Sequence, residues 1–239
     1  MEMSLELCKN QLKQIPTFLP SGLEILRLAD NSINALHASD FADLMKLRVL
    51  DLRNNLIATV PPSAFSSLYN LQSLILDGNN MESVSAPLRL PRLKYLSMAD
   101  NKLNSFPTNF FASFQSLHFL SLSGNFLTKV LRDVKNLENL SEFLLSENQL
   151  TSIDGAQLPG RLQKLDCSNN LIQRVFGTHI KSPASGYKKN SSQQSTEETS
   201  PGHIVFINAL LRGSLKFISV LELAIIRDGI LSQMEAVLI

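Results

Sequence analysis

Aromatic and charged side chains suited to noncovalent recognition recur along this chain at one fixed spacing. The pairs related in this way are Tyr95 and Phe119, Arg27 and Asp51, and Arg53 and Asp77. Aromatic rings and ionised groups bind protein surfaces by packing and by charge complementarity. The chemistry that they predict is therefore recognition of a partner, provided that the fold brings each pair together.

Residues that could catalyse a reaction or bind a metal show no comparable order. The sequence lacks a phosphate-binding glycine loop, a dinucleotide fingerprint, a zinc-protease helix motif and a hydrolase nucleophile elbow. The four histidines are His37, His118, His179 and His203, and none has a second ligand at metal-binding spacing. We predict a protein that is not an enzyme and that uses no cofactor and no metal.

One asparagine recurs in a fixed frame and at nearly even intervals along most of the chain. Its eight positions are Asn10, Asn31, Asn55, Asn79, Asn101, Asn125, Asn148 and Asn170. Apolar residues stand 5 and 3 positions before each asparagine and 2 and 5 positions after it, and also 8 positions before it in every unit but the first. In the fifth unit these are Leu93, Leu96, Met98, Leu103 and Phe106. A pattern copied eight times indicates one structural unit repeated over residues 1–180.

The spacing within each unit predicts how that unit folds. Alternating leucines indicate a short strand whose leucines point inward. The asparagine that follows can satisfy backbone groups where the chain turns away from the strand. Because one unit cannot bury its own apolar face, the units must stack. We predict an α/β repeat solenoid of about eight repeats, curved, with a concave parallel β-sheet and a mostly irregular convex side.

The pattern L-x-x-L-x-L-x-x-N-x-L-x-x-I resembles the leucine-rich repeat family, whose coils are right-handed. Units of this length that carry Phe41, Phe65 and Phe111 resemble the extracellular subclass found in Toll-like receptor ectodomains and small leucine-rich proteoglycans. This resemblance implies an extracellular or cell-surface protein with a receptor-like or matrix role, in innate immune or adhesion signalling. The alternatives are a cytosolic scaffold that regulates a phosphatase, a GTPase or another signalling enzyme, and a structural matrix protein.

Period-2 alternation directs the residues between the inward leucines out of the concave sheet. It places Tyr95 beside Phe119 in one column, that is, at equivalent positions of successive strands. Ile75 and Leu144 belong to the next column, two residues further along their strands, and we predict that the four residues bind a protein partner. The alternative is that these aromatic residues only shield neighbouring strands. A charged patch of Arg27, Asp51, Arg53 and Asp77 would orient the partner; the alternative is solvated ion pairs that contribute ~0–1 kcal/mol each.

Composition argues against a nucleic-acid partner and against a transmembrane segment. The chain has 22 basic and 21 acidic residues, so it lacks the positive field that nucleic-acid binding requires. No run reaches the ~18 apolar residues of a transmembrane helix, and no secretory signal is visible in the opening residues.

Two cysteines and two glycosylation sequons bear on the compartment. Cys8 and Cys167 fall in the first and eighth units, roughly 34 Å apart and too distant for a disulfide. We expect Cys167 in the core and Cys8 as a free thiol. Extracellular-type repeats without cysteine-rich caps lead us to expect an incomplete chain, with self-association through the uncapped end. The sequons predict glycosylation at Asn139 and Asn190.

The repeat pattern stops near residue 180. Residues 181–203 are polar and predict a flexible linker. Residues 204–239 become apolar again and are compatible with an amphipathic helix for a membrane surface or a partner. The alternatives are a makeshift cap on the last coil and a splice-derived tail with no stable place.

Overall fold

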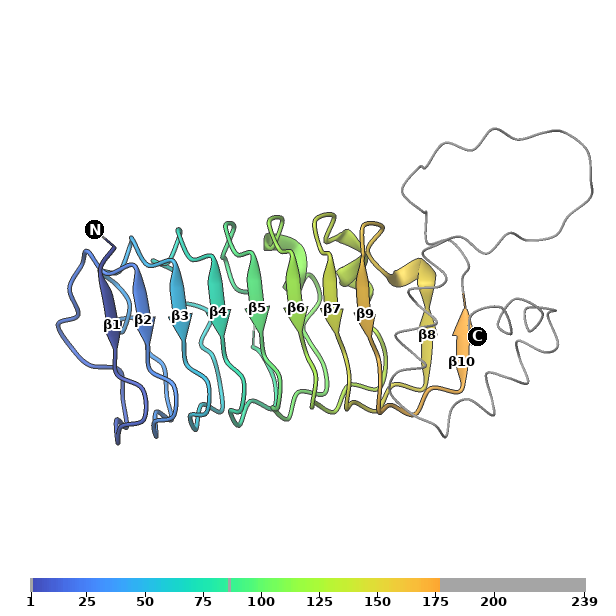
Figure 1. Ribbon diagram of the computed structural model, residues 1–239, viewed down its shortest axis with the longest axis horizontal. Helices are drawn as coiled ribbons and strands as arrows, with labels where there is room; N and C mark the ends of the chain where they lie inside the picture. Colours follow the sequence, from blue (N-terminus) through green and yellow to red (C-terminus); the bar gives the residue numbers. More distant parts are fainter. Residues whose placement is uncertain (1, 86, 177–239) are drawn as a thin grey trace, which may run out of the picture.

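A computed structural model of the chain describes residues 2–85 and 87–176. The linker expected at 181–203 and the tail expected at 204–239 lie outside the described residues. The described part is a row of coils, each of which contributes one short strand to a common sheet (Figure 1).

Eight strands of three residues form the main sheet. They are β1 (Ser4–Glu6), β2 (Ile25–Arg27), β3 (Val49–Asp51), β4 (Ser73–Ile75), β5 (Tyr95–Ser97), β6 (Phe119–Ser121), β7 (Glu142–Leu144) and β9 (Lys164–Asp166). All neighbours pair in parallel, in this order. The register joins equivalent positions of successive repeats, such as Tyr95 with Phe119. Each strand therefore lies where the asparagine frame places it, four to six residues before the asparagine.

The connections that return to the sheet hold little regular structure. Within the described residues the helical elements are three 3₁₀ helices: η1 (Phe110–Ser113), η2 (Arg132–Asn136) and η3 (Gly155–Gln157). Two further strands, β8 (Ser152–Asp154) and β10 (Arg174–Phe176), pair in parallel as a separate sheet near the last coils (Figure 1). No helix in this part of the chain is long and apolar enough to span a membrane.

Inward leucines and phenylalanines fill the interior of the coils. The central residue of most strands, such as Leu50 and Leu96, is completely buried. On the connecting side Phe41 and Phe65 are buried, with ring centroids 5.7 Å apart, and Phe111 is buried in η1. One core therefore runs continuously through the stack, as the repeat pattern requires.

The asparagines form a hydrogen-bonded ladder between coils. Asn101 Nδ2 donates to the carbonyl oxygens of Met98 and Ala99 in its own coil, at 3.3 and 2.9 Å. It also donates to the carbonyl oxygen of Leu76 in the preceding coil at 3.0 Å, and its Oδ1 accepts from the Met81 N–H at 3.1 Å. The same bonds recur at every member of this asparagine ladder. Its members are Asn31, Asn55, Asn79, Asn101, Asn125, Asn148 and Asn170.

The residue before each repeat asparagine has a left-handed backbone in all eight coils. These residues are Lys9, Asp30, Asn54, Gly78, Asp100, Gly124, Glu147 and Asn169, with φ between 52° and 64°. A Cβ on Gly124 would lie 2.2 Å from Asp100 Oδ1 of the preceding coil. Aspartate, asparagine and glycine suit this conformation, which explains why they prevail there. The parallel solenoid confirms the fold class expected from the repeat.

Candidate protein-recognition surface

Tyr95 and Phe119 lie side by side on the outward face of the main sheet, which we call the sheet face. Their rings are stacked, with centroids 4.2 Å apart and planes only 3° from parallel. The stack follows from register, because β5 and β6 are adjacent and neighbouring parallel strands lie ~4.8 Å apart. Both side chains are half-buried, so part of each ring is open to a partner. The adjacency predicted from the repeat spacing is present in the structure.

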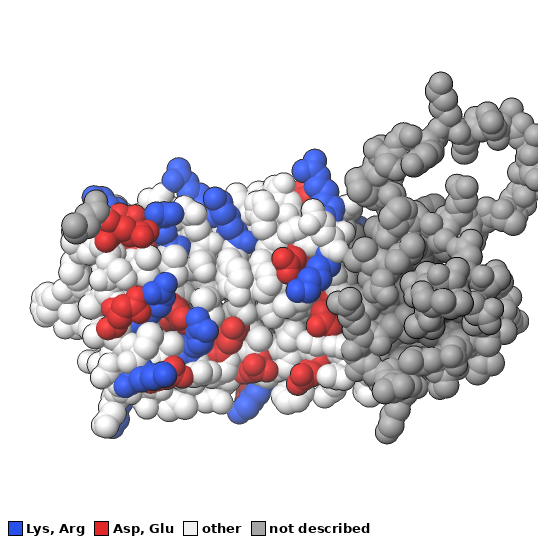
Figure 2. All heavy atoms as spheres, viewed as in Figure 1, with Lys and Arg blue, Asp and Glu red and all other residues white. Residues whose placement is uncertain are grey.

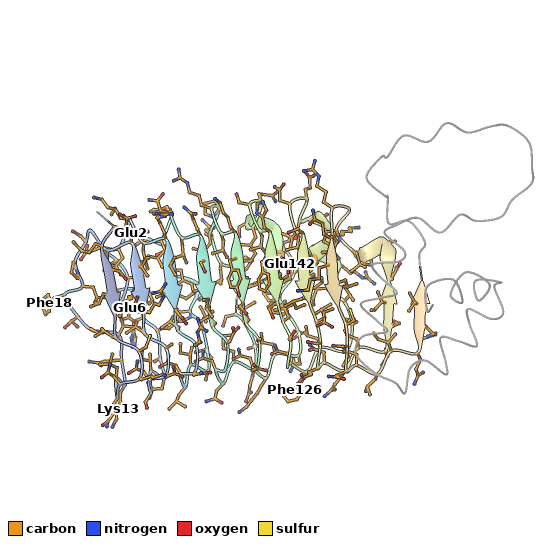
Figure 3. The ribbon with its side chains drawn as sticks, in the orientation of Figure 1. Glu2, Glu6, Lys13, Phe18, Phe126 and Glu142 are labelled. Carbon is orange, nitrogen blue, oxygen red and sulfur yellow. The ribbon has the colours of Figure 1, made fainter. Side chains whose placement is uncertain are left out.

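Ile75 and Leu144 stand on either side of this stack, one column along the strands. Between them the same column holds Ser97 and Ser121, which are outward-facing yet only 3% and 5% exposed. These four residues and the two rings make an uncharged area over the middle of the sheet, with charged side chains on both sides (Figure 2). Glu142 on β7 bounds this area; it pairs in register with Phe119 and forms an ion pair of 3.2 Å with Lys164 (Figure 3).

The charged patch is organised around Asp51 and Arg53. Arg53 Nε lies 3.0 Å from Asp51 Oδ1 and Arg53 Nη2 lies 2.6 Å from Asp51 Oδ2, a two-pronged ion pair. The Asp51 side chain is 3% exposed, whereas that of Arg53 is 47% exposed. The hydrogen bond with Asp51 raises the pKa of Arg53 above its ordinary value. Arg53 therefore covers the carboxylate and presents the exposed charge of the pair.

Asp77 lies between this ion pair and the aromatic stack. Its Oδ1 accepts the Ala99 N–H at 2.8 Å, and burial raises the pKa of its carboxyl group. Burial also raises the pKa of Tyr95, and the negative charge of Asp77 adds to that rise. The Tyr95 phenol consequently stays protonated at neutral pH and can donate a hydrogen bond.

The partners in the observed ion pairs differ from those expected when Arg27 is placed beside Asp51 and Arg53 beside Asp77 in neighbouring strands. Arg27 and Asp51 do pair in register, but the guanidinium of Arg27 binds Glu6 in the preceding coil. Arg53 binds Asp51 rather than Asp77, because Asp51 is only two residues earlier in the same coil and lies within reach of the guanidinium. The signal that could have revealed this pair is the Asp-x-Arg sequence at 51–53.

The predicted glycosylation site in the described residues and both cysteines lie outside the aromatic stack and the charged patch. Asn139 is exposed, and its Nδ2 donates to the Gln115 carbonyl oxygen at 2.8 Å; Asn190 lies outside the described residues. Cys167 is buried, which raises the pKa of its thiol, and Cys8 is a partly exposed free thiol. Residues 2–85 and 87–176 contain no group of three or more His, Cys, Asp or Glu side chains arranged to hold a metal.

Sequence comparison supports the repeat architecture. A family model described as "Leucine rich repeat" matches residues 21–81. The chain is built of leucine-rich repeats. Among solved structures, an APL1 leucine-rich repeat domain is 29% identical with a TM-score of 0.62, covering 70% of this chain and 44% of that one. A complex of latrophilin 3, Unc5D and FLRT2 gives 25% identity and a TM-score of 0.62, over 72% of this chain and 59% of that chain.

Curated relatives of the leucine-rich repeat chain are small leucine-rich proteoglycans. Mouse nephrocan is 49% identical over 218 residues, covering 72% of this chain and 42% of nephrocan. Bovine osteomodulin is 33% identical over 108 residues, covering 37% of this chain and 26% of osteomodulin. The chain thus spans less than half of either relative. These relatives are non-enzymatic and secreted, and they give no support to the expected link with innate immune signalling.

Proposed function

We propose that this leucine-rich repeat chain is an extracellular recognition module of the proteoglycan type, which binds a protein through its sheet face. The observation that carries the proposal is the stacked Tyr95–Phe119 pair, half-exposed within an uncharged area. Aromatic residues that are already held rigid lose little entropy on binding and dominate many interfaces. The secreted relatives favour this function over the cytosolic scaffold.

In this proposal the charged side chains around the aromatic stack orient the partner protein on the sheet face. Arg53, exposed above Asp51, and Asp77 follow β3 and β4 on one side of the stack, and Glu142 on β7 with Lys164 on β9 lies on the other. Ion pairs at the rim of an interface mainly change the association rate and exclude wrong partners. A partner with an apolar centre between charged ends would fit this distribution.

Affinity capture with a paired variant tests the proposal. The full chain and its Tyr95→Ala/Phe119→Ala variant serve as baits for secreted, matrix and cytosolic fractions. We expect a protein from the secreted or matrix fraction that binds the native chain about thirtyfold more tightly, or ~2 kcal/mol, than the variant.

The chain offers a matched control for this experiment. Met45 and Tyr69 also lie one repeat apart and are 58% and 59% exposed, but they stand off the sheet face. Met45→Ala/Tyr69→Ala removes as much exposed apolar surface and should leave capture unchanged. Equal loss in both variants, or capture only from the cytosolic fraction, would contradict the proposal.

A further inference from the structure

A second candidate site lies off the main sheet, in the connections that follow β6 and β7. These connections enclose an open hollow of about 380 Å³. Its polar lining consists of Lys129, Arg132, Lys135, Ser152, Asp154 and Gln157. We propose that this hollow binds a sulfated polysaccharide chain, a ligand that the sheet-face function does not require.

Two of the three cations, Arg132 and Lys135, line up because of the local helix type. Lys129, Arg132 and Lys135 are spaced three residues apart, and η2 spans Arg132–Asn136. A 3₁₀ helix has three residues per turn and rises about 2 Å per residue, so side chains at this spacing stand above one another. Arg132 and Lys135 therefore present charge along one line, ~6 Å apart, and Lys129 precedes them.

These cations carry little compensation from the protein. All three side chains are exposed, and none has a carboxylate within 4.0 Å among the described residues. Asp133 is used elsewhere, since its Oδ2 accepts the Asn109 N–H at 2.6 Å. Asp154 is the one carboxylate among the described lining residues, and its Oδ1 accepts the Ala156 N–H at 3.0 Å. The described lining, with three cations and one carboxylate, thus has an excess of two positive charges.

The rest of the lining selects among polyanions. The Ser152 hydroxyl, the Gln157 amide and the second carboxylate oxygen of Asp154 can form hydrogen bonds with sugar hydroxyls. Among the described residues no aromatic side chain lines the hollow, so they offer no stacking surface to the bases of a single-stranded nucleic acid. Val130 is the single apolar member of this described lining, which offers little to a lipid chain. Sulfate groups for the cations and hydroxyls for the polar residues occur together in a sulfated polysaccharide.

Binding of a fluorescent heparin octasaccharide to the full chain tests this inference. Lys129→Gln/Arg132→Gln/Lys135→Gln should raise the Kd at least tenfold, measured by fluorescence anisotropy. For the native chain, log Kd should rise with log salt concentration with a slope of roughly 2 to 3, as expected for release of counterions from about three contacts, and the slope should fall in the variant. Tyr95→Ala/Phe119→Ala should bind the octasaccharide normally, which separates this site from the sheet face.

A charge-matched control distinguishes the site from general basicity. Lys46, Lys94 and Arg161 are exposed, lie before β3, β5 and β9, and form no ion pair among the described residues. Replacing these three with Gln should change the Kd less than twofold. The inference is overturned if the native chain fails to bind heparin at physiological salt, or if the control variant loses as much affinity as the site variant. Equal affinity for unsulfated hyaluronan, or equal displacement by a single-stranded polynucleotide, would also overturn it.

Discussion

Each ladder asparagine satisfies backbone groups of two coils at once, so its loss should destabilise the stack. Asn101→Ala leaves the buried N–H of Met81 without its acceptor and removes one of the two side-chain donors to the carbonyl oxygen of Leu76, which keeps Asn79. We expect the free energy of unfolding to fall by about 1–3 kcal/mol, measured by chemical denaturation.

Asn104 provides the control for this substitution, because it is exposed and lies outside the ladder. Asn104→Ala should shift the unfolding midpoint much less than Asn101→Ala. Identical denaturation curves for the two variants would show that the ladder does not stabilise the coils.

Burial of Asp77 predicts a defined pH dependence. Because burial raises the pKa of this carboxyl group, the folded state binds the proton more tightly than the unfolded state. Ionisation therefore weakens folding as pH rises from 3.8 through the folded-state pKa. Asp77→Asn can still accept the Ala99 N–H and cannot ionise, so its stability relative to the native chain should be greater at about pH 7 than at about pH 3. Denaturation at both values tests this, and the opposite trend would mean that attraction to Arg53 outweighs burial.

Adjacency of side chains was predictable at this scale, but their contacts were not. The repeat spacing predicts that Tyr95 neighbours Phe119, and parallel register places them so. Spacing could not predict that Arg53 covers Asp51, because that outcome depends on the rotamer of a long side chain. Likewise Ser97 and Ser121 are outward by alternation yet buried, since larger side chains surround them.

At the scale of one coil, the left-handed residue before each asparagine controls the turn. Gly124 has φ of 64°, a conformation that costs an L residue roughly 1–2 kcal/mol. A Cβ there would also meet Asp100 Oδ1 at 2.2 Å. We expect Gly124→Ala to lower the free energy of unfolding by at least ~1 kcal/mol, and Asp100→Gly in the same chain, which removes the facing carboxylate and suits the left-handed backbone there, to recover part of it. No loss in the single variant would contradict this account of the turn.

Strands were the most predictable elements and the connections the least. The inward leucines and the asparagine frame predict all eight strands of the main sheet. They do so because successive side chains of a strand point alternately to its two faces, which leaves a regular pattern in the sequence. β8, β10 and η2 lie in connections whose lengths vary among repeats, where no fixed frame exists. The cation spacing of three at Lys129, Arg132 and Lys135 was a visible signal, but its meaning depends on the 3₁₀ geometry.

For the whole molecule, the solenoid should fold without the residues that follow it. The change in composition predicts a boundary at residue 180, and the described coils share one continuous core. A chain of residues 1–180 should give a β-rich circular dichroism spectrum and a cooperative melt. A spectrum of an unfolded chain would show that residues 181–239 are an integral part of the fold.

The central claim is that a partner protein covers the sheet face, and hydroxyl-radical footprinting tests it without any substitution. Tyr95 and Phe119 are half-buried on that face. Tyr69 and Phe126 (the latter labelled in Figure 3) are 59% and 48% exposed elsewhere and serve as internal references. With the captured protein at saturation, oxidation of Tyr95 and Phe119 should fall several-fold while that of Tyr69 and Phe126 stays constant. Unchanged oxidation of Tyr95 and Phe119, with protection of Tyr69 or Phe126 instead, would contradict the claim.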